Sequence, residues 1–223
     1  MNRAPDTPRG ALRAAGGVVV RAARPDDSDA PSLVFAAARP AYRSAAGSDE
    51  RAQAILEQLW PVRGHSASFE HALIAELDGK VVGVLIAFPA HERYRLHFAL
   101  ARRSLRYGTL RRWPLLLMAL PPLIAATPHP PRASYYVATI AIERGARRRG
   151  IGSTLAGHAE LAAAARGFRL ISAHTGSRHL PARRALERYG AHAGRDRHWG
   201  YVLYTKAVGG PPPRASDESA KQP

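Results

Sequence analysis

The sequence predicts an α/β protein with a mixed β-sheet and helices on both faces. Stretches rich in β-branched and aromatic residues alternate with helical patterns, but not as a simple run of strand–helix repeats. Two apolar runs flank Asp78-Gly79, which is a strong hairpin signal. A late strand passes through a basic, glycine-containing turn directly into an alanine-rich helix. With 223 residues, 46% of them hydrophobic, the chain can bury one substantial core.

Each half of the chain supplies part of this sheet. In the first half we expect a strand at 17–22, helices at 31–42 and from Ser48 to Trp60, and hairpin strands at 71–77 and 80–88. In the second half we expect a strand at 134–142, a helix at 151–166 ended by Gly167, a strand at 168–174, a helix at 180–189 closed by Gly190, and a strand at 201–208.

The segment 92–127 interrupts this order between the third and fourth strands. Arginines alternate with leucines there, and Gly108 and Pro114 predict a pair of helices broken near those positions. The pair could pack on the domain with its arginines in water. It could also form a wall or lid of a substrate pocket, a contact in a homodimer, or a patch that touches a membrane surface.

Composition bounds the remaining organisation. Residues 1–15 are expected to form a flexible N-terminal tail, 16–208 the single domain, and 209–223 a disordered C-terminal tail, because the last stretch is rich in proline and polar residues. No signal peptide is evident, and the apolar run 113–126 is too short and too rich in proline to span a membrane. We therefore expect a cytoplasmic protein without a transmembrane segment.

Charge and cysteine usage exclude some functions. The chain has no cysteine, so disulfides, thiolate metal sites and cysteine nucleophiles are excluded. The formal net charge is +16, and only three of the 33 basic residues, Lys80, Lys206 and Lys221, are lysines. Together with abundant alanine and proline, this bias is typical of GC-rich coding, so a nucleic-acid partner is the lesser explanation of the charge.

The turn 147–152 (RRRGIG) carries the strongest functional signal. A phosphate ligand needs unpaired backbone amides, close approach of the backbone and positive charge. The strand-to-helix turn supplies the amides, the glycines let the backbone approach closely, and the arginines supply the positive charge. The further residues of a dinucleotide-binding fingerprint and of a P-loop are absent. A basic turn without a ligand remains the alternative from this motif alone.

The segment around this turn resembles the acetyl-CoA-binding motif of the GNAT (GCN5-related N-acetyltransferase) superfamily. In that family an apolar strand end leads into Q/R-x-x-G-x-G/A and a helix; Ile140 and Ile142 match the strand end, and Arg147, Gly150 and Gly152 match the loop. The hairpin strands and the segment PARRALERYGA resemble further family elements, over residues 17–208 apart from the insert.

The resemblance implies a GNAT fold and a transfer of an acetyl group from acetyl-CoA to a primary amine by direct attack in a ternary complex. Backbone amides of the turn would hold the pyrophosphate, and the strand end would pair with the pantetheine arm and polarise the thioester carbonyl. The cofactor-binding residues implied in this way are Ile140, Ile142, Arg147, Arg148, Arg149, Gly150, Ile151, Gly152, Ser153 and His179.

The late helix departs from the family pattern N-x-x-A-x-x-x-Y, whose tyrosine protonates the departing thiolate. His179 occupies the asparagine position and Leu186 the tyrosine position, and leucine cannot donate a proton. Tyr189, about one helical turn on, is a candidate acid, with core packing as its alternative role. His179 could be the acid or could bind CoA.

No general base is marked by the motifs. His174, at the end of the strand expected to splay from 134–142, is the catalytic candidate, and Glu70 and His65 are others. A histidine hydrogen-bonded within the fold is the alternative for His174. The histidines lack metal-ligand spacing, so we expect no metal site.

Three functions remain open. The first is an N-acetyltransferase acting on a small-molecule or peptide amine; few acids lie near the expected pocket, which disfavours polyamines. The second is a non-catalytic GNAT-like module that binds CoA, suggested by Leu186. The third, a nucleic-acid-binding protein, rests only on charge and lacks aromatic platforms and reading motifs.

Overall fold

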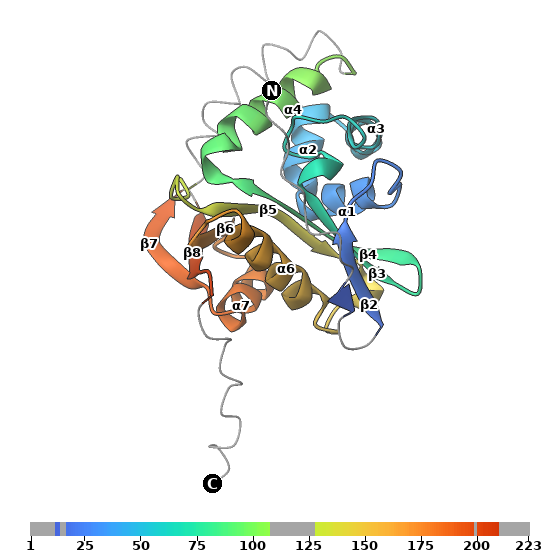
Figure 1. The fold of residues 1–223 in the computed structure, drawn as a ribbon. Helices are drawn as coiled ribbons and strands as arrows, with labels where there is room; N and C mark the ends of the chain where they lie inside the picture. Colours follow the sequence, from blue (N-terminus) through green and yellow to red (C-terminus); the bar gives the residue numbers. More distant parts are fainter. Residues whose placement is uncertain (1–11, 14–16, 108–127, 199, 210–223) are drawn as a thin grey trace.

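The computed structural model describes residues 12–13, 17–107, 128–198 and 200–209 (Figure 1). One sheet joins its strands in the order β1-β2-β3-β4-β5-β6-β8-β7. All neighbours are antiparallel except β5 and β6, which are parallel. The strands are β1 (Leu12–Arg13), β2 (Val18–Ala22), β3 (Ala72–Leu77), β4 (Lys80–Pro89), β5 (Tyr135–Ile142), β6 (Leu170–Gly176), β7 (His192–His198) and β8 (Tyr201–Ala207).

Helices cover both faces of this sheet, as expected. The helices α1 (Ala30–Ala37), α2 (Arg39–Ala46), α3 (Asp49–Leu59) and α4 (Arg93–Ser104) lie on one side, and α6 (Ile151–Ala165) and α7 (Leu180–Arg188) lie on the other (Figure 1). Short 3₁₀ turns span Phe69–His71, Ala90–Glu92 and Arg144–Ala146. No described helix is long and apolar enough to cross a membrane.

The two larger apolar clusters of the described residues lie on opposite faces of the sheet. Trp60, Phe88 and Tyr136 belong to the cluster beneath α1, α3 and α4. Leu155 and Tyr135 belong to the cluster beneath α6. Tyr135 and Tyr136 face opposite ways because successive strand residues alternate between faces. One strand thereby contributes to both layers.

The hairpin between β3 and β4 forms where the sequence predicts it. Asp78 has φ 52° and Gly79 has φ 75°, which fits a two-residue turn of the type that aspartate and glycine favour. Ser48 likewise caps α3, since its hydroxyl accepts a hydrogen bond from the amide of Arg51 at 3.2 Å.

The expected single helix at 31–42 is wrong. The structure has two helices there, which meet at Ala38, a residue with a non-helical φ of −132°. Pro40 explains the break, because proline lacks an amide hydrogen and is tolerated only in the first turn of a helix. It lies in the first turn of α2.

Two strands were not predicted. The segment His192–His198 reads HAGRDRH, without apolar alternation, yet it pairs with β8 as β7. Leu12 and Arg13, within the expected N-terminal tail, pair with β2 as β1. The first inserted helix is present as α4, whereas the second falls in 108–127, outside the described residues. The remainder of the N-terminal tail and the C-terminal tail from 210 also lie outside them.

Candidate functional site

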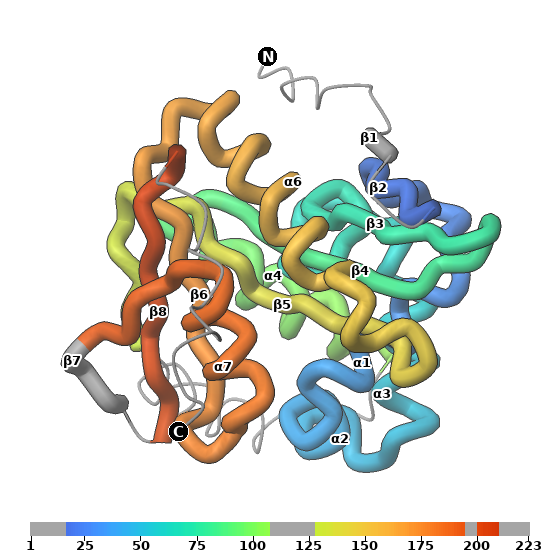
Figure 2. The backbone as a smooth tube through the Cα atoms, turned by 90° about the horizontal axis from the view of Figure 1, so that it is seen from below, coloured from blue at the N-terminus to red at the C-terminus, as the bar shows by residue number. Residues whose placement is uncertain are grey.

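The two central parallel strands separate towards one end of the sheet. β5 and β6 pair only at Tyr135↔Ile171, Tyr136↔Ser172 and Val137↔Ala173. Beyond these pairs β5 continues against β4 as far as Ile142, and β6 continues against β8 as far as Gly176. The strands diverge from a shared end in Figure 2. The part of the sheet between residues 138–142 and 174–176 is therefore a gap between two strands.

The backbone of β5 turns hydrogen-bonding groups into this gap. The amide of Glu143 donates to the carbonyl of Val82 at 2.9 Å, on the β4 side. Because these groups alternate along an antiparallel strand, the amides and carbonyls of Ile142 and Ile140 point the opposite way. The side chain of Ile140, which is 43% exposed, adds an apolar surface at the same place. An extended apolar chain with amide groups would fit this edge as an added strand.

The loop after β5 presents unpaired amides at the start of α6. Among hydrogen bonds of the described residues, none uses the amides of residues 148–153 as donors; the amide of Thr154 is the first to bond, to the carbonyl of Gly150 at 3.0 Å. Arg148 (φ 63°) and Gly150 (φ 76°) have left-handed conformations, a backbone form that gathers amides around an anion. A Cβ at Gly150 would meet nothing within 4 Å. The space above this loop is open.

The loop residues differ in what their side chains do. Arg148, Arg149 and Ser153 are exposed, and Ile151 is buried beneath α6. Arg147 is exposed too, but its Nε donates to the carbonyl of Ile142 at 3.1 Å, so its side chain folds back over the strand end. Gly152 lies close to the gap, because a Cβ there would be 4.0 Å from the Cδ1 of Ile140. The predicted loop and strand end therefore form one continuous surface.

His174 is the first residue of β6 beyond the last pair with β5. Its Nδ1 lies 2.6 Å from the hydroxyl of Tyr136, and the two rings stack with centroids 5.7 Å apart. The ring of Tyr201 packs edge-on against the other side of the imidazole at 5.4 Å. No hydrogen bond among the described residues involves Nε2. The imidazole is thus held by two tyrosines at the mouth of the gap.

Burial and a buried arginine control the charge of this pair. Burial lowers the pKa of His174 to about 4, with a further contribution from the positive charge of Arg93. Burial raises the pKa of Tyr136 to about 12. Arg93, at the start of α4, is 4% exposed, lies 5.4 Å from the ring centre of Tyr136 and donates to the carbonyl of Pro128 at 2.9 Å. At neutral pH the imidazole and the phenol are both uncharged.

The sequence did not mark Tyr136, Tyr201 or Arg93. Tyr136 and His174 share a face because Tyr136 pairs with Ser172, two residues before His174. Tyr201 shares it because it pairs with Gly176. Detecting them would have required the strand register, which the sequence pattern alone does not contain.

The start of α7 carries His179. Its side chain is exposed, and its amide donates to the carbonyl of Gly176 at 2.9 Å. Leu186, at the position of the family's tyrosine, packs against the small cluster of Ala191, Val202 and Tyr204. This leucine has an apolar packing role.

Tyr189 lies in a separate polar cluster. Its hydroxyl donates to Oε2 of Glu160 at 2.7 Å, and Lys206 lies over its ring at 4.2 Å and also donates to Oε2. Burial, followed by the bond to Glu160, raises the pKa of Tyr189. Lys206 pairs with Ile171, at the closed end of β5 and β6, and His174 lies three residue steps, or about 10 Å, further along β6. The structure thus places Tyr189 apart from His174 and His179.

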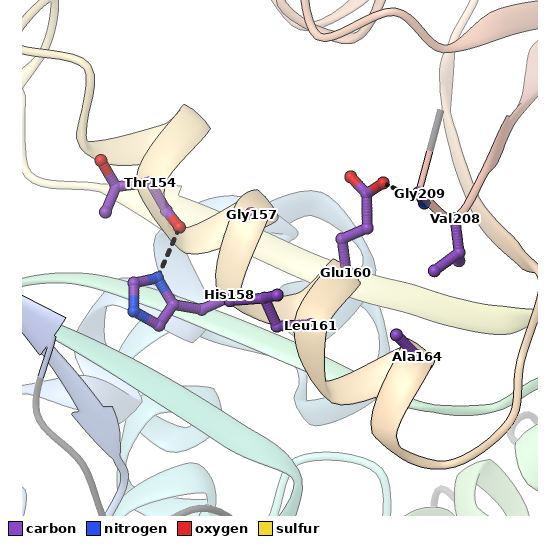
Figure 3. Close-up of a pocket in the computed structure, with 8 residues that line it drawn as sticks. All are labelled: Thr154, Gly157, His158, Glu160, Leu161, Ala164, Val208 and Gly209. Carbon is purple, nitrogen blue, oxygen red and sulfur yellow. Dashed lines mark hydrogen bonds between the residues drawn. The ribbon is translucent and has the colours of Figure 1, made fainter. Parts of the chain in front are cut away.

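A groove runs along the outer face of α6 beside this cluster. Figure 3 shows Glu160 at one end, where it accepts a hydrogen bond from the amide of Gly209 at 3.0 Å. His158 lines the groove and bonds through Nδ1 to the carbonyl of Thr154 at 2.9 Å. Leu161, 60% exposed, forms part of its wall. The groove does not include the residues of the β5–β6 gap.

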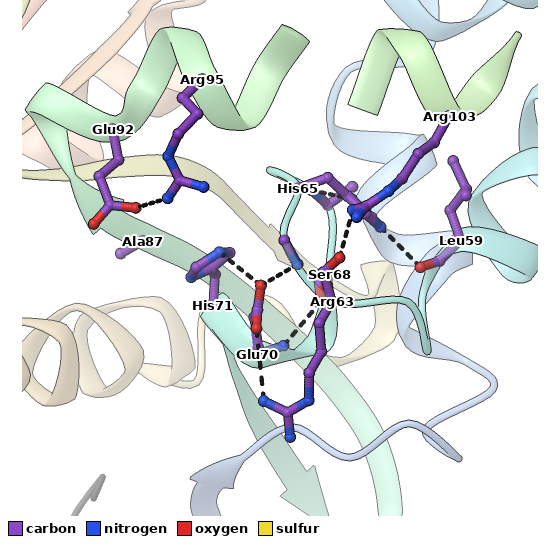
Figure 4. Close-up of polar contacts among 12 residues, drawn as sticks. Leu59, Arg63, His65, Ser68, Glu70, His71, Ala87, Glu92, Arg95 and Arg103 are labelled. Atoms are coloured by element: carbon purple, nitrogen blue, oxygen red, sulfur yellow. Dashed lines mark hydrogen bonds and ion pairs between the residues drawn. The ribbon is translucent and has the colours of Figure 1, made fainter. Parts of the chain in front are cut away.

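The other candidate bases are fixed by their own loop (Figure 4). His65 is fully buried, with Nε2 3.0 Å from the carbonyl of Leu59 and Nδ1 accepting from the amide of Ala67 at 3.2 Å. Burial lowers its pKa. Glu70 accepts from the amide of Gly64, and Arg63 lies 3.6 Å from its other oxygen. Both side chains hold the loop before β3 in place.

Comparisons with known proteins agree with this geometry. The model of the acetyltransferase (GNAT) family matches residues 34–191. No curated protein matches the sequence. The crystal structure of an acetyltransferase superposes with a TM-score of 0.65, at 18% identity over 85% of this chain and 98% of that one.

Two further solved structures have the same fold. One is an N-acetyltransferase from Staphylococcus aureus Mu50, with a TM-score of 0.57 and 17% identity over 85% of this chain and 99% of that one. The other is a Drosophila melanogaster polyamine N-acetyltransferase that forms N-acetylagmatine, with a TM-score of 0.56 and 16% identity over 86% and 100% of the chains. The family match covers more than half of the sequence, and the chain therefore belongs to the GNAT family of N-acetyltransferases.

Proposed function

We propose that the protein transfers an acetyl group from acetyl-CoA to a primary amine by direct attack within a ternary complex. The observation that carries this proposal is the gap between β5 and β6, which is lined by the edge of β5 at Ile140 and Ile142 and leads to the unpaired amides of residues 148–153. One surface thus offers a strand edge for the pantetheine arm and an anion site for the pyrophosphate. Acetyl-CoA would be consumed, so we infer a cytoplasmic location, where this co-substrate is available.

The residues that would hold the co-substrate fit its chemistry. Amides from Arg148 to Ser153 would bind phosphate oxygens, and the exposed guanidinium groups of Arg148 and Arg149 would add charge-assisted contacts. The amide of Ile142 would donate to the thioester carbonyl oxygen. Arg147 contributes by fixing the end of β5 through the carbonyl of Ile142.

We assign the role of general base to His174. Once the attacking nitrogen has bonded to the carbonyl carbon, that nitrogen becomes strongly acidic, so a weakly basic imidazole suffices to take its proton. Nε2 would accept this proton, which requires that Nδ1 carry a hydrogen and donate to the oxygen of Tyr136. Tyr136 is then a positioning residue that fixes the tautomer and the ring orientation.

The leaving group needs a proton as the carbon–sulfur bond breaks. His179, exposed at the start of α7, is the candidate to supply it, and the products are the N-acetylated amine and CoA. The placement of Tyr189 against Glu160 supports its alternative role in packing. A general acid contributes roughly 10²–10⁴-fold, and thiolate is a tolerable leaving group, so catalysis would survive loss of His179 at a reduced rate.

Calorimetry with acetyl-CoA tests the proposal. Gly150→Glu places a carboxylate where a phosphate would lie, so we expect it to abolish detectable binding. Gly150→Asn is the matched control, because asparagine tolerates the left-handed backbone without adding charge. Equal acetyl-CoA affinity in wild type and Gly150→Glu would refute the proposed site, and no binding by folded wild type would refute the function.

A further inference from the structure

A hollow of about 650 Å³ opens where β6 and β8 meet. Its walls are the loop after β6 and the start of β8, and its lining residues are Gly176, Ser177, Arg178, His179, Gly200 and Tyr201. The amide of Ser177 donates to the carbonyl of Gly200 at 2.6 Å, which ties the two walls together. Arg183 also stabilises the loop, because its Nη1 donates to the carbonyl of Ser177 at 3.1 Å. The hollow is thus a built feature of the fold.

The hollow adjoins the proposed base through Tyr201. Tyr201 lines it and also packs edge-on against the imidazole of His174. An acceptor whose amine reaches His174 can therefore extend past Tyr201 into the hollow. Two strand residues and the following turn separate His174 from Arg178, so this path is on the order of 10 Å long.

The charge of the hollow is one-sided. Arg178 and His179 are exposed, and no carboxylate is among the described residues that line it. The nearest acid of α7, Glu187, accepts a hydrogen bond from the hydroxyl of Tyr204 at 2.9 Å. A cationic group entering the hollow would meet the guanidinium of Arg178, which forms no ion pair among the described residues, whereas an anionic group would form a charge-assisted hydrogen bond.

From this arrangement, we propose that the acceptor is a primary amine that carries an anionic group, carboxylate or phosphate, about 10 Å from the amine, and that Arg178 binds that group. The inference rests on the proposed acetyl transfer and names its substrate class. The proposed anionic acceptor differs from the polyamines, which are cationic, used by the polyamine N-acetyltransferase of the same fold.

A series of amines with one spacer and different ends tests the class. The probes are 6-aminohexanoate, 6-aminohexyl phosphate, hexylamine and 1,6-diaminohexane. Acetylation is followed by mass spectrometry, and binding to the CoA-loaded enzyme by calorimetry. We expect kcat/KM for the better anionic probe to exceed kcat/KM for hexylamine by about tenfold, because the anionic probe gains one charge-assisted contact. The difference from the diamine should be larger still. Comparison of the two anionic probes identifies the preferred group.

Two variants locate the effect. Arg178→Glu is expected to raise KM for the anionic probes at least tenfold and to favour the diamine, with KM for acetyl-CoA unchanged. Arg184→Glu is the matched control, because this exposed arginine of α7 does not line the hollow; it should leave the order of probes as in wild type. An unchanged preference in Arg178→Glu would overturn the inference.

Failure of this inference differs from failure of the proposed function. If hexylamine or the diamine is acetylated as well as the anionic probes, the acetyl transfer stands and the substrate class is wrong. If no probe is either acetylated or bound, the substrate class is also wrong. The proposed function itself fails if the folded wild-type protein does not bind acetyl-CoA.

Discussion

The hydroxyl of Tyr136 lies 2.6 Å from Nδ1 of His174, across the point where β5 and β6 stop pairing. A hydrogen bond at this point leaves Nε2 as the nitrogen that can react with a molecule in the gap. Burial keeps both groups uncharged near neutral pH, so the imidazole is in the neutral form that can accept a proton.

Removal of the imidazole should slow the reaction without weakening co-substrate binding. His174→Gln is expected to lower kcat/KM by about 10²-fold, the lower end of the range for general-base catalysis, with the acetyl-CoA dissociation constant unchanged. Steady-state kinetics and calorimetry measure the two quantities. A decrease in kcat/KM of less than threefold would assign His174 a structural role.

Removal of the tyrosine hydroxyl tests the positioning role. Tyr136→Phe deletes one hydrogen bond worth about 1 kcal/mol, so we expect kcat to fall roughly fivefold with KM unchanged. Tyr135→Phe is the control on the opposite face of the same strand; its hydroxyl bonds to the carbonyl of Ala87 at 3.2 Å. Equal kcat values in the two variants would contradict the assignment.

Acid should destabilise the fold between about pH 6.5 and pH 4, the ordinary and the lowered pKa of histidine. Burial lowers the pKa of His97 to about 4, as it does for His174. In this window each such histidine is protonated in the unfolded chain and neutral in the folded chain. The free energy of unfolding therefore falls as pH falls, by up to about 1.4 kcal/mol per pH unit for each histidine.

Urea unfolding at pH 7, 5.5 and 4.5 measures this slope. His97→Gln removes one of the buried histidines with a lowered pKa and should make this slope smaller. A slope in His97→Gln equal to that of wild type would show that other groups cause the acid sensitivity.

Loss of the Tyr189 hydroxyl should affect stability and not catalysis. Tyr189→Phe removes the bond to Glu160, which keeps its bonds from Lys206 and Gly209, so we expect a loss of about 1 kcal/mol in unfolding free energy. Its kcat should stay within twofold of wild type. A kcat loss of 10²-fold, the scale of a lost general acid, would instead restore Tyr189 as the proton donor.

A methyl group at Gly83 should disturb both the core and the site. Its Cβ would lie 2.9 Å from Cδ1 of Ile142 and 3.2 Å from Cδ1 of Leu155, and such crowding costs about 1–3 kcal/mol. Gly83→Ala should also weaken acetyl-CoA binding, since Ile142 borders the gap. Gly157→Ala is the control: its Cβ meets nothing within 4 Å on α6, so it should stabilise the helix by up to about 1 kcal/mol.

The sequence was sufficient where a local rule decides the structure. Asp78-Gly79 fixed the hairpin, Ser48 the start of α3, and the glycines of 147–152 the loop. Pro40 is the local signal that divides the first predicted helix into two. His192–His198 carries no strand pattern, because its pairing with β8 is made by the backbone and not by side chains that alternate in polarity.

The site was predictable only in part for a similar reason. The loop is contiguous in sequence, so its motif could be read directly. Tyr136, His174 and Tyr201 come from three strands, and only their register brings the three rings together. The place of His174 at a strand end can be read from the sequence, whereas its partners depend on long-range pairing.

Three residue pairs are all that join β1–β5 to β6–β8 within the sheet. A co-substrate bound in the proposed gap would contact strands on both sides of this junction. A ligand that binds only the folded chain at a hundred times its dissociation constant adds about 2.7 kcal/mol of stability. The lifetime of this enzyme would then follow the acetyl-CoA supply, so that a cell short of acetyl groups would also lose the catalyst that uses them.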